Sequence, residues 1–475
     1  MADARLLTHD FPPATPDAWR ALVAKTLGEA PFASLEKATA EGLVIAPLYP
    51  PGALPGAQPF PARPFDADRH WDLRTLTAHP DAATANRELM TDLEGGAASV
   101  IVRIDPTGER GVAVGSADGL ARVLDGVILE LAPTVLDAGF LGPKAADWLG
   151  TVAKASPGAK LNLHLDPLSA FAESGASPGP IESHLVSAAT VGARLADTYP
   201  QAQLFLASGR VVHEAGAGEA LEVAVAAAAA VAYAKALVRA GMPMAQAFAR
   251  ITLGLSADAD YFLTIAKLRA ARAVWARIAT ASGAEPAARI EARSSQRMLA
   301  AQDAWTNMIR LTAAGFGAAV GGADAVVLGT FTDAIGLPTT FARRQSRNAQ
   351  LVLMEEAHIG RVADPAAGSG YVEAMTDQMA RAAWTLFQDI ERQSGIITAL
   401  TSGWVAEQVA AAVAARPEGK IIGVTAFPPA KNEPVEVERV TRQPVDAPSP
   451  ALPGPDGRCP PLKPIRLSEA FEVAA

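Results

Sequence analysis

Apolar runs of strand length alternate with longer helical patterns through most of the chain. These runs predict strands at Ser99–Asp105, Val127–Leu131, Leu161–Asp166, Gln203–Ser208, Ile251–Leu255, Arg289–Ser294 and Ala325–Leu328, with a weakly patterned eighth near Arg361–Asp364. Helical patterns follow at Ser116–Asp125, Lys144–Ala155, Glu182–Asp197, Glu219–Ala240, Tyr261–Thr280, Ala301–Ala318 and Val372–Gln393. Such a regular alternation favours a closed (β/α)8 barrel, the TIM barrel, over an open sheet. We therefore predict an α/β protein with this barrel in residues 86–395.

The segments on either side of the predicted barrel have different patterns. Residues 1–85 predict an extended N-terminal arm, with a helix at Asp17–Leu27 and an extended run at Gly42–Tyr49. From Pro50 to Trp71 the arm is rich in proline and contains several aromatic residues, which favours a segment docked on a surface over a free linker. Residues 396–475 predict a helix at Trp404–Ala415, a short strand at Ile421–Val424 and a Pro-rich tail from Pro428 to Pro464.

One face of the predicted strands is polar, although branched apolar side chains normally fill the lumen of a parallel barrel. Along Leu161–Asp166, leucine alternates with asparagine, histidine and aspartate, and the period of two sends the polar set inward. The lumen is either open to a threaded polar ligand or closed by pairing of its charges. Because unpaired buried charges are costly, we expect ion pairs across it. The candidate lumen residues are Arg103, Glu130, His164, Glu291 and Arg293.

Composition and charge argue against several classes of function. The chain of 475 residues is 50% hydrophobic, has a net charge of −9 and lacks a cluster of Lys and Arg, so we expect no nucleic-acid partner. The single Cys459 allows no internal disulfide, and the N-terminus has no signal-like apolar core, which predicts a cytoplasmic protein. Val223–Ala236 is mostly alanine and shorter than a membrane span, so it predicts a buried helix and no membrane association. The seven histidines have no metal-ligand spacing, so no protein-built metal site is expected.

Two short motifs lie at positions where chemistry is expected. The turn Ser208–Glu214 follows a predicted strand, and residues after the carboxyl ends of barrel strands carry the catalytic groups in this fold. Its Arg210 and Val211 nevertheless offer neither a nucleophile nor a general acid or base. The string Asp364–Gly370 is similar to the glycine loop of adenine-type methyltransferases, but it lacks a full preceding strand and a later Asn-Pro-Pro-aromatic motif. We interpret it as a structural turn.

Ordered strings cover nearly the whole chain, from about Leu22 to Phe471. They are Phe32–Glu36, Gly42–Tyr49, Trp71–Arg74, Ser208–Gly209, Glu214–Gly216, Asp260–Arg272, Phe341–Arg344, Asp364–Pro365 and Gly368–Glu373. Together they resemble the adenosylcobalamin-dependent acyl-CoA mutases, in particular the methylmalonyl-CoA mutase family. The resemblance implies a (β/α)8 barrel and a role in the interconversion of (R)-methylmalonyl-CoA and succinyl-CoA by radical chemistry.

Two departures from the family's pattern set the role that the resemblance implies. Catalytic chains of the family read Ser-Gly-Tyr-His where this chain has Ser-Gly followed by Arg210 and Val211, and they read Arg-Gln-Tyr where it has Arg-Thr followed by Leu76. Valine cannot donate a hydrogen bond to a thioester carbonyl, and leucine supplies no hydroxyl. The resemblance therefore implies that Leu76, Arg210 and Val211 are degenerate positions and that no residue of this chain is catalytic.

The resemblance also implies where the cofactor is held. Catalytic chains carry a C-terminal cobalamin domain whose Asp-x-His-x-x-Gly motif supplies the lower cobalt ligand, and we expect no such domain here because the sequences around His70 and His213 lack the full motif. Adenosylcobalamin and the acyl-CoA are therefore expected on a homologous large catalytic subunit, with this chain as its supporting partner in a heterodimer. The alternative is a self-sufficient mutase barrel that works with a separate cobalamin-binding subunit.

Overall fold

Eight parallel strands close into a barrel in the computed structural model, which describes residues 14–50, 63 and 70–472. In order around the ring they are β3 (Asp72–Thr77), β4 (Ser99–Arg103), β5 (Thr134–Asp137), β6 (Leu161–Leu165), β8 (Gln203–Ser208), β9 (Ile251–Ala257), β10 (Ile290–Ser294) and β11 (Ala325–Val327). The pairing of β11 with β3 completes the ring. The predicted (β/α)8 barrel is confirmed, and Ser208 ends β8 at the carboxyl end of the barrel.

Two of the predicted strands are wrong. Val127–Leu131 lies in a loop, where Ile128 and Leu131 are 58% and 67% exposed, and the strand is β5, which begins just after Pro133. A short apolar run does not by itself distinguish a strand from a loop, and here the pairing of β5 with β4 and β6 decides its place. The run near Arg361–Asp364 instead includes the end of a helical turn, η7 (Ile359–Arg361), outside the barrel.

The barrel begins with β3, which the sequence pattern does not reveal. This strand is half polar and lies inside residues 1–85, the segment predicted as an arm. Its polar side chains find partners only within the closed barrel, where Arg74 donates a hydrogen bond to the Ser99 hydroxyl of β4 (2.7 Å). Apart from this earlier start of the barrel, the division of the chain into domains stays a prediction.

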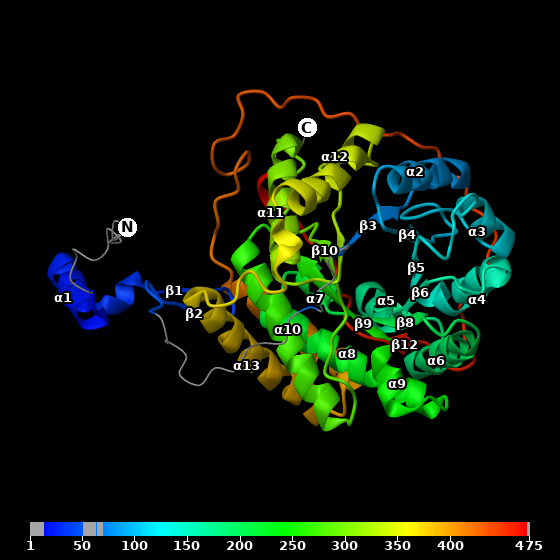
Figure 1. Ribbon diagram of the computed structural model, residues 1–475, viewed down its shortest axis with the longest axis horizontal. Helices are drawn as coiled ribbons and strands as arrows, with labels where there is room; N and C mark the ends of the chain where they lie inside the picture. The colour runs from blue at the N-terminus through cyan, green and yellow to red at the C-terminus, as the bar shows by residue number, and fades with distance from the viewer. Residues whose placement is uncertain (1–13, 51–62, 64–69, 473–475) are drawn as a thin grey trace, which may run out of the picture.

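A ring of helices surrounds the strands (Figure 1). Its main members are α2 (Ala82–Glu94), α3 (Ala117–Val123), α4 (Gly142–Val152), α6 (Ile181–Thr198), α8 (Glu219–Arg239), α10 (Tyr261–Ala281), α11 (Asn307–Val320), α12 (Thr340–Leu351) and α13 (Gly370–Arg392). The leucines of β6 pack with these helices in one large core, while His164 lines the cavity at the strands' carboxyl ends. The alternation predicted for this strand therefore places its apolar side chains outward.

Helix α8 is, in the part of the chain that the structure describes, the one helix long and apolar enough to cross a membrane. In this fold 78% of its most apolar window is buried, and the helix contacts β8, β9, α6, α10 and α13. Its alanines allow these neighbours to approach closely, since they add little side-chain volume. The prediction of a buried helix is confirmed.

The N-terminal arm extends away from the barrel. Figure 1 shows α1 (Pro16–Leu27) at the far left, joined to the body through the hairpin of β1 (Lys37–Ala38) and β2 (Val44–Ile45). No residue of α1 is buried. The predicted docking segment from Pro50 to Trp71 lies mostly outside the described residues, so its role stays a prediction.

Two sets of hydrogen bonds attach the base of the arm to the barrel. The Glu41 carboxylate accepts hydrogen bonds from the backbone N–H groups of Ala220 and Leu221 at the start of α8 (2.9 and 3.1 Å). The Gln378 side chain on α13 exchanges two hydrogen bonds with the Val44 backbone (3.1 Å each). The arm therefore projects from a fixed point on the helical ring.

The C-terminal residues run in extended form over the barrel surface, as the orange and red trace in Figure 1 shows. The predicted helix is present as α15 (Trp404–Ala415), and β12 (Gly457–Arg458) pairs with β7 (Ala176–Ser177). The predicted strand at Ile421–Val424 is wrong. This segment is a turn in which Gly423 adopts a φ of 81°, a conformation that interrupts a strand.

Candidate functional site

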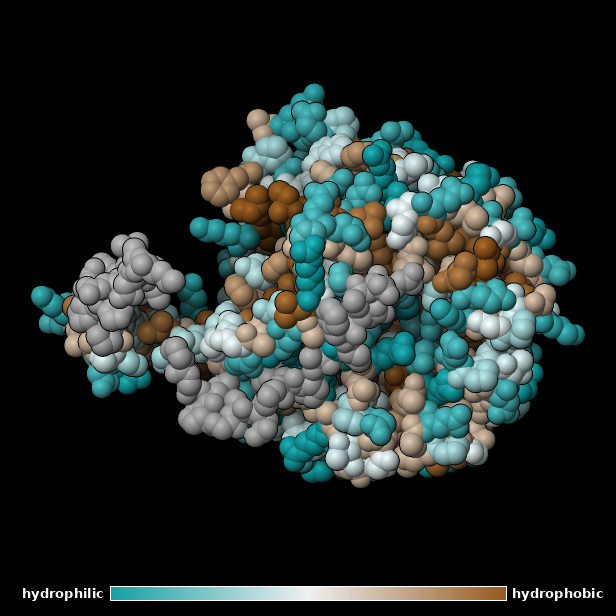
Figure 2. Space-filling view, viewed as in Figure 1, coloured by the Kyte–Doolittle hydropathy of each residue, from teal (hydrophilic) through white to brown (hydrophobic). Residues whose placement is uncertain are grey.

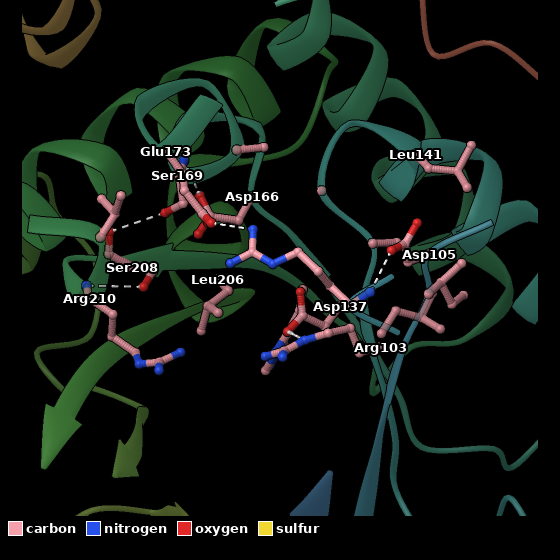
Figure 3. A pocket seen from close by; sticks show the side chains of 18 of the residues that line it. Arg103, Asp105, Asp137, Leu141, Asp166, Ser169, Glu173, Leu206, Ser208 and Arg210 are labelled. Atoms are coloured by element: carbon pink, nitrogen blue, oxygen red, sulfur yellow. Dashed lines mark hydrogen bonds and ion pairs between the residues drawn. The ribbon is translucent and has the colours of Figure 1, made fainter. Parts of the chain in front are cut away.

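The carboxyl ends of the barrel strands surround a cavity of about 590 Å³ (Figure 3). Arg103 of β4, Asp137 of β5 and Ser208 of β8 line it. Two short helices complete the wall, α5 (Pro167–Ser174) after β6 and α7 (Arg210–Glu214) after β8. Since barrel enzymes hold their substrates at this end, the cavity is the candidate functional site.

Charged side chains close the lumen beneath this cavity. Arg293 of β10 donates hydrogen bonds to Glu291 (2.6 Å) and, across the barrel, to Asp137 (2.9 Å). Arg74 of β3 donates to Glu291 (2.6 Å) and to Asp72 (2.6 Å). The side chains of Arg74, Glu291 and Arg293 are 7%, 1% and 5% exposed. The ion pairs expected across the lumen are therefore present, and they form one connected network.

The network keeps its members charged. Burial alone would raise the pKa of Glu291, but the positive charges of Arg293 and Arg74 outweigh it and hold that pKa below its usual range. Burial likewise opposes the charge of Asp137, and Arg103 with Arg293 lowers its pKa. The pKa of Arg293 is raised because Glu291 and Asp137 outweigh the effect of burial. All these groups are ionised at neutral pH.

The structure brings four of the five predicted lumen residues together and excludes one. Arg103 pairs with Asp137 (3.3 Å), which links it to Arg293 and through Arg293 to Glu291, while His164 lies 3.9 Å from Glu291. Glu130 lies instead in the loop before β5, outside the barrel strands, so its prediction as a lumen residue is wrong. A strand at Val127–Leu131 would turn Glu130 inward, but the structure has no strand there.

Three members of the network, Asp72, Arg74 and Asp137, are not among the lumen residues that the sequence pattern predicts. Two of them belong to β3, and the third ends β5. The string Thr-Val-Leu-Asp at 134–137 carries the needed signal, because its alternation puts Asp137 on the same face as Val135. The string of β3 is half polar, and its pattern contains no signal that would distinguish this strand from a segment of an extended arm.

His164 has a strained backbone at the floor of the cavity. Its φ is 43°, and the register of β6 against β8 shifts between Asn162 and Leu165, as at a β-bulge. Its buried Nδ1 lies 3.9 Å from Glu291 and has no hydrogen-bond partner among the described residues. Burial lowers the pKa of His164 to about 4, so the imidazole is neutral at pH 7.

The three positions predicted to be degenerate, Leu76, Arg210 and Val211, lie around the carboxyl end of the barrel. Leu76 packs against Ile101, Val135 and Val327 in an apolar cluster, and it lines a second cavity of about 460 Å³ beside the first. Val211 lines the first cavity. The Arg210 side chain lines both cavities, and its closest ionic contact is Glu214 at 3.8 Å.

His213, next along the chain, does not face either cavity. Its ring is completely buried, with Nδ1 3.0 Å from Glu222 and Nε2 3.3 Å from Asp258. Glu222 also pairs with Lys267 of α10 (2.6 Å). This buried network joins α7, α8 and α10, so His213 holds these helices together and has a structural role.

The glycine string Asp364–Gly370 forms a turn before α13. Gly368 adopts a φ of 83°, and its N–H donates a hydrogen bond to Glu373 (3.1 Å). Asp364 pairs with Arg269 of α10 (3.1 Å). The string is not preceded by a strand, so the interpretation as a structural turn is confirmed and a methyltransferase loop is not supported.

Comparison with known proteins identifies similar chains. The family model described as methylmalonyl-CoA mutase matches residues 45–448. The chain is 38% identical over 499 residues to the methylmalonyl-CoA mutase small subunit of Streptomyces virginiae. The aligned region covers 99% of this chain and 77% of the relative.

Two further relatives have the same kind of name. The probable methylmalonyl-CoA mutase small subunit of Mycobacterium tuberculosis (strain ATCC 25618 / H37Rv) is 38% identical over 433 residues, covering 85% of this chain and 68% of the relative. The methylmalonyl-CoA mutase small subunit of Propionibacterium freudenreichii subsp. shermanii is 34% identical over 439 residues, covering 86% and 67%.

Proposed function

The chain belongs to the methylmalonyl-CoA mutase family, and we propose that within it the chain is a non-catalytic small subunit that supports a homologous large subunit. The large subunit would hold adenosylcobalamin and interconvert (R)-methylmalonyl-CoA and succinyl-CoA. The names of the small-subunit relatives support the pairing with a larger chain. The cytoplasmic location stays a prediction.

The closed lumen carries the non-catalytic part of this proposal. An acyl-CoA threaded along the barrel axis would have to part the ion pairs that Glu291 makes with Arg74 and Arg293. Separating a buried pair leaves uncompensated charge, at a cost of about 3–5 kcal/mol. The Leu76 cluster adds an apolar obstruction to the same path. A substrate is therefore expected to enter the partner's barrel rather than this one.

The side chains at the carboxyl end do not fit adenosylcobalamin as a cofactor of this chain. Within the described residues, the histidines that line the two cavities are His164 and His79. His164 turns its Nδ1 toward Glu291, while His79 accepts a hydrogen bond from the Asp81 N–H (3.1 Å) and lies 3.5 Å from Glu438. Neither ring is placed to hold a cobalt ion. We therefore assign the cofactor to the large subunit.

The arm is the segment best suited to contact that partner. Leu22 of α1 is 66% exposed, and Phe32 is 38% exposed while its ring packs edge-on against Trp19. Glu41 fixes the base of the arm to α8, and α1 with the turn at Phe32–Leu35 presents these apolar side chains away from the barrel (Figure 1). Exposed apolar side chains of this kind gain from burial in an interface.

Turnover of methylmalonyl-CoA tests the proposed role. We would compare this chain alone, the large chain alone and their mixture, each with added cofactor. The expected result is no activity from this chain and a mixture that is faster or more stable than the large chain. Activity of this chain alone would overturn the non-catalytic assignment, and a mixture that matches the large chain in rate and stability would remove the supporting role.

Deletion of residues 1–70 tests the docking role of the arm. Since β3 begins at Asp72, the deletion leaves every barrel strand in place. Gel filtration should show the truncated chain released from the partner, while circular dichroism shows a folded barrel. Full-length chain carrying Arg194→Gln, a change on the outer face of α6, is the control and should stay bound. Co-elution of the truncated chain with its partner would contradict the docking role.

A further inference from the structure

The two cavities at the carboxyl end meet at a wall that is rich in arginine. Six residues line both of them: Arg103, Glu109, Arg110, Arg210, Arg293 and Gln296. Four of them are arginines, and Arg110 already pairs with Glu173 of the first cavity (2.6 Å). The guanidinium group of Arg442 forms an ion pair with the Glu109 carboxylate (2.9 Å). We call these six residues the arginine wall.

Three guanidinium groups of the arginine wall keep unused hydrogen-bond donors. Arg293 engages Glu291 through Nε and Asp137 through Nη1, but its buried Nη2 has no partner among the described residues. Arg210 makes no side-chain hydrogen bond in that part of the chain, and its Nε is buried and unpartnered. Arg103 uses only Nε, toward Asp137. Buried donors left unpaired are costly, so an acceptor placed here would be stabilising.

The same three groups come from different elements and converge. Arg103 ends β4, Arg293 is in β10 and Arg210 opens α7. Figure 3 shows Arg210 and Arg103 on opposite sides of the cavity. Burial and the neighbouring charges of Arg293 and Arg103 lower the pKa of Arg210. An anion between them would relieve this repulsion.

Two carboxylates beside the wall accept hydrogen bonds from other groups. Asp137 accepts from both Arg103 and Arg293. Glu214 accepts hydrogen bonds at Oε2 from the backbone N–H groups of Gln296 and Arg297 (3.1 Å each). The Oε1 of Glu214 lies 3.8 Å from Nη2 of Arg210 and offsets part of its charge, but it accepts no hydrogen bond from that guanidinium group. The donors of Arg210 are therefore still available to another acceptor.

We propose that the arginine wall binds a phosphate group, as the free ion or as the monoester of a small metabolite. One arginine fork can hold a planar carboxylate, whereas three guanidinium groups on different sides match the several oxygens of a tetrahedral anion. The adjoining cavities, about 590 and 460 Å³, leave room for the rest of a small phosphorylated molecule. This site goes beyond the mutase role and does not depend on it.

Calorimetric titration of the full-length chain with inorganic phosphate tests the proposal. Wild-type protein should bind at one site, and Arg210→Gln and Arg103→Gln should each weaken binding about tenfold or more, the usual effect of losing a hydrogen bond to a charged group. Arg194→Gln is the matched control, because it removes a positive charge from the outer face of α6, where Arg194 pairs with Asp147. It should bind phosphate as wild type does.

Circular dichroism and urea unfolding check that the variants fold. Where Arg210→Gln fails that check, Arg210→Lys keeps the charge but loses the fork, and it should bind with intermediate affinity. Wild-type protein that does not bind phosphate, or an Arg210→Gln variant that is folded and binds as tightly as wild type, would overturn the proposal.

Competition experiments separate the sources of the phosphate group. Glycerol phosphate and coenzyme A, both phosphate monoesters, are titrated against bound inorganic phosphate, with acetate at equal ionic strength as the planar control. Displacement by glycerol phosphate identifies a monoester site, and its failure identifies a site for the free ion. If acetate displaces the bound phosphate at the same concentration as glycerol phosphate does, the proposal that the site prefers a tetrahedral anion is refuted.

Discussion

Neutralising Glu291 measures how firmly the lumen is closed. Arg74 and Arg293 each donate a hydrogen bond to Glu291 at 2.6 Å. The variant Glu291→Gln keeps the side-chain shape and removes the negative charge. Its amide NH2 group then faces one of the two guanidinium groups, so that a donor meets a donor. With charge centres about 4 Å apart and an effective dielectric constant of about 20, each lost pair is worth about 4 kcal/mol of Coulomb energy.

The net loss is smaller than two such pairs because both arginines keep a second carboxylate. Arg74 retains Asp72 at 2.6 Å, and Arg293 retains Asp137 at 2.9 Å. We therefore expect the free energy of unfolding to fall by about 3–5 kcal/mol, the range for breaking a buried pair. Urea denaturation followed by circular dichroism measures this change as a lower midpoint at unchanged slope.

A matched surface variant provides the control. Asp147→Asn removes a carboxylate from an exposed pair with Arg194 between α4 and α6, and exposed pairs contribute about 0–1 kcal/mol. Glu291→Gln should be clearly more destabilising than this control. Equal effects would mean that water reaches the lumen charges, and the argument that a closed lumen excludes substrate would fail.

Three further predictions concern pH, the degenerate positions and the arm. The pKa values of Glu291 and Asp137 are lowered in the folded state, so these groups stabilise the fold at pH values above their unfolded pKa values. This stabilisation should be lost as pH falls below about 4.5. In that range the urea midpoint should decline less steeply in Glu291→Gln than in wild type. The double variant Leu76→Tyr with Val211→His should show no methylmalonyl-CoA turnover by this chain alone with added cofactor, because the ion pairs still close the lumen; measurable turnover would contradict this reason. Glu41→Gln should speed proteolytic cleavage of the arm while leaving barrel unfolding within about 1 kcal/mol of wild type, since its carboxylate accepts the first N–H groups of α8; equal cleavage rates would contradict the anchoring role.

The sequence alone determined the features that depend on local periodicity. Leucine alternation in β6 predicts the buried outer face, and the alanine-rich run of α8 predicts a helix packed inside the molecule. Repeated strand and helix patterns predict the barrel, because each parallel strand needs a covering helix before the next. The resemblance to the family also implies, without coordinates, that Leu76 and Val211 stand where catalytic chains have tyrosine and histidine.

The tertiary structure decided which strands close the ring and which charges meet. The pairing of β11 with β3 joins residues far apart in the chain, and no local pattern marks a half-polar strand such as Asp72–Thr77 as its partner. That closure brings Arg74 to Glu291 and Arg293 to Asp137, while it leaves Glu130 in a loop outside. The unused donors of Arg210 and Arg293 become visible only there, because register across strands, rather than sequence spacing, sets which side chains share the lumen.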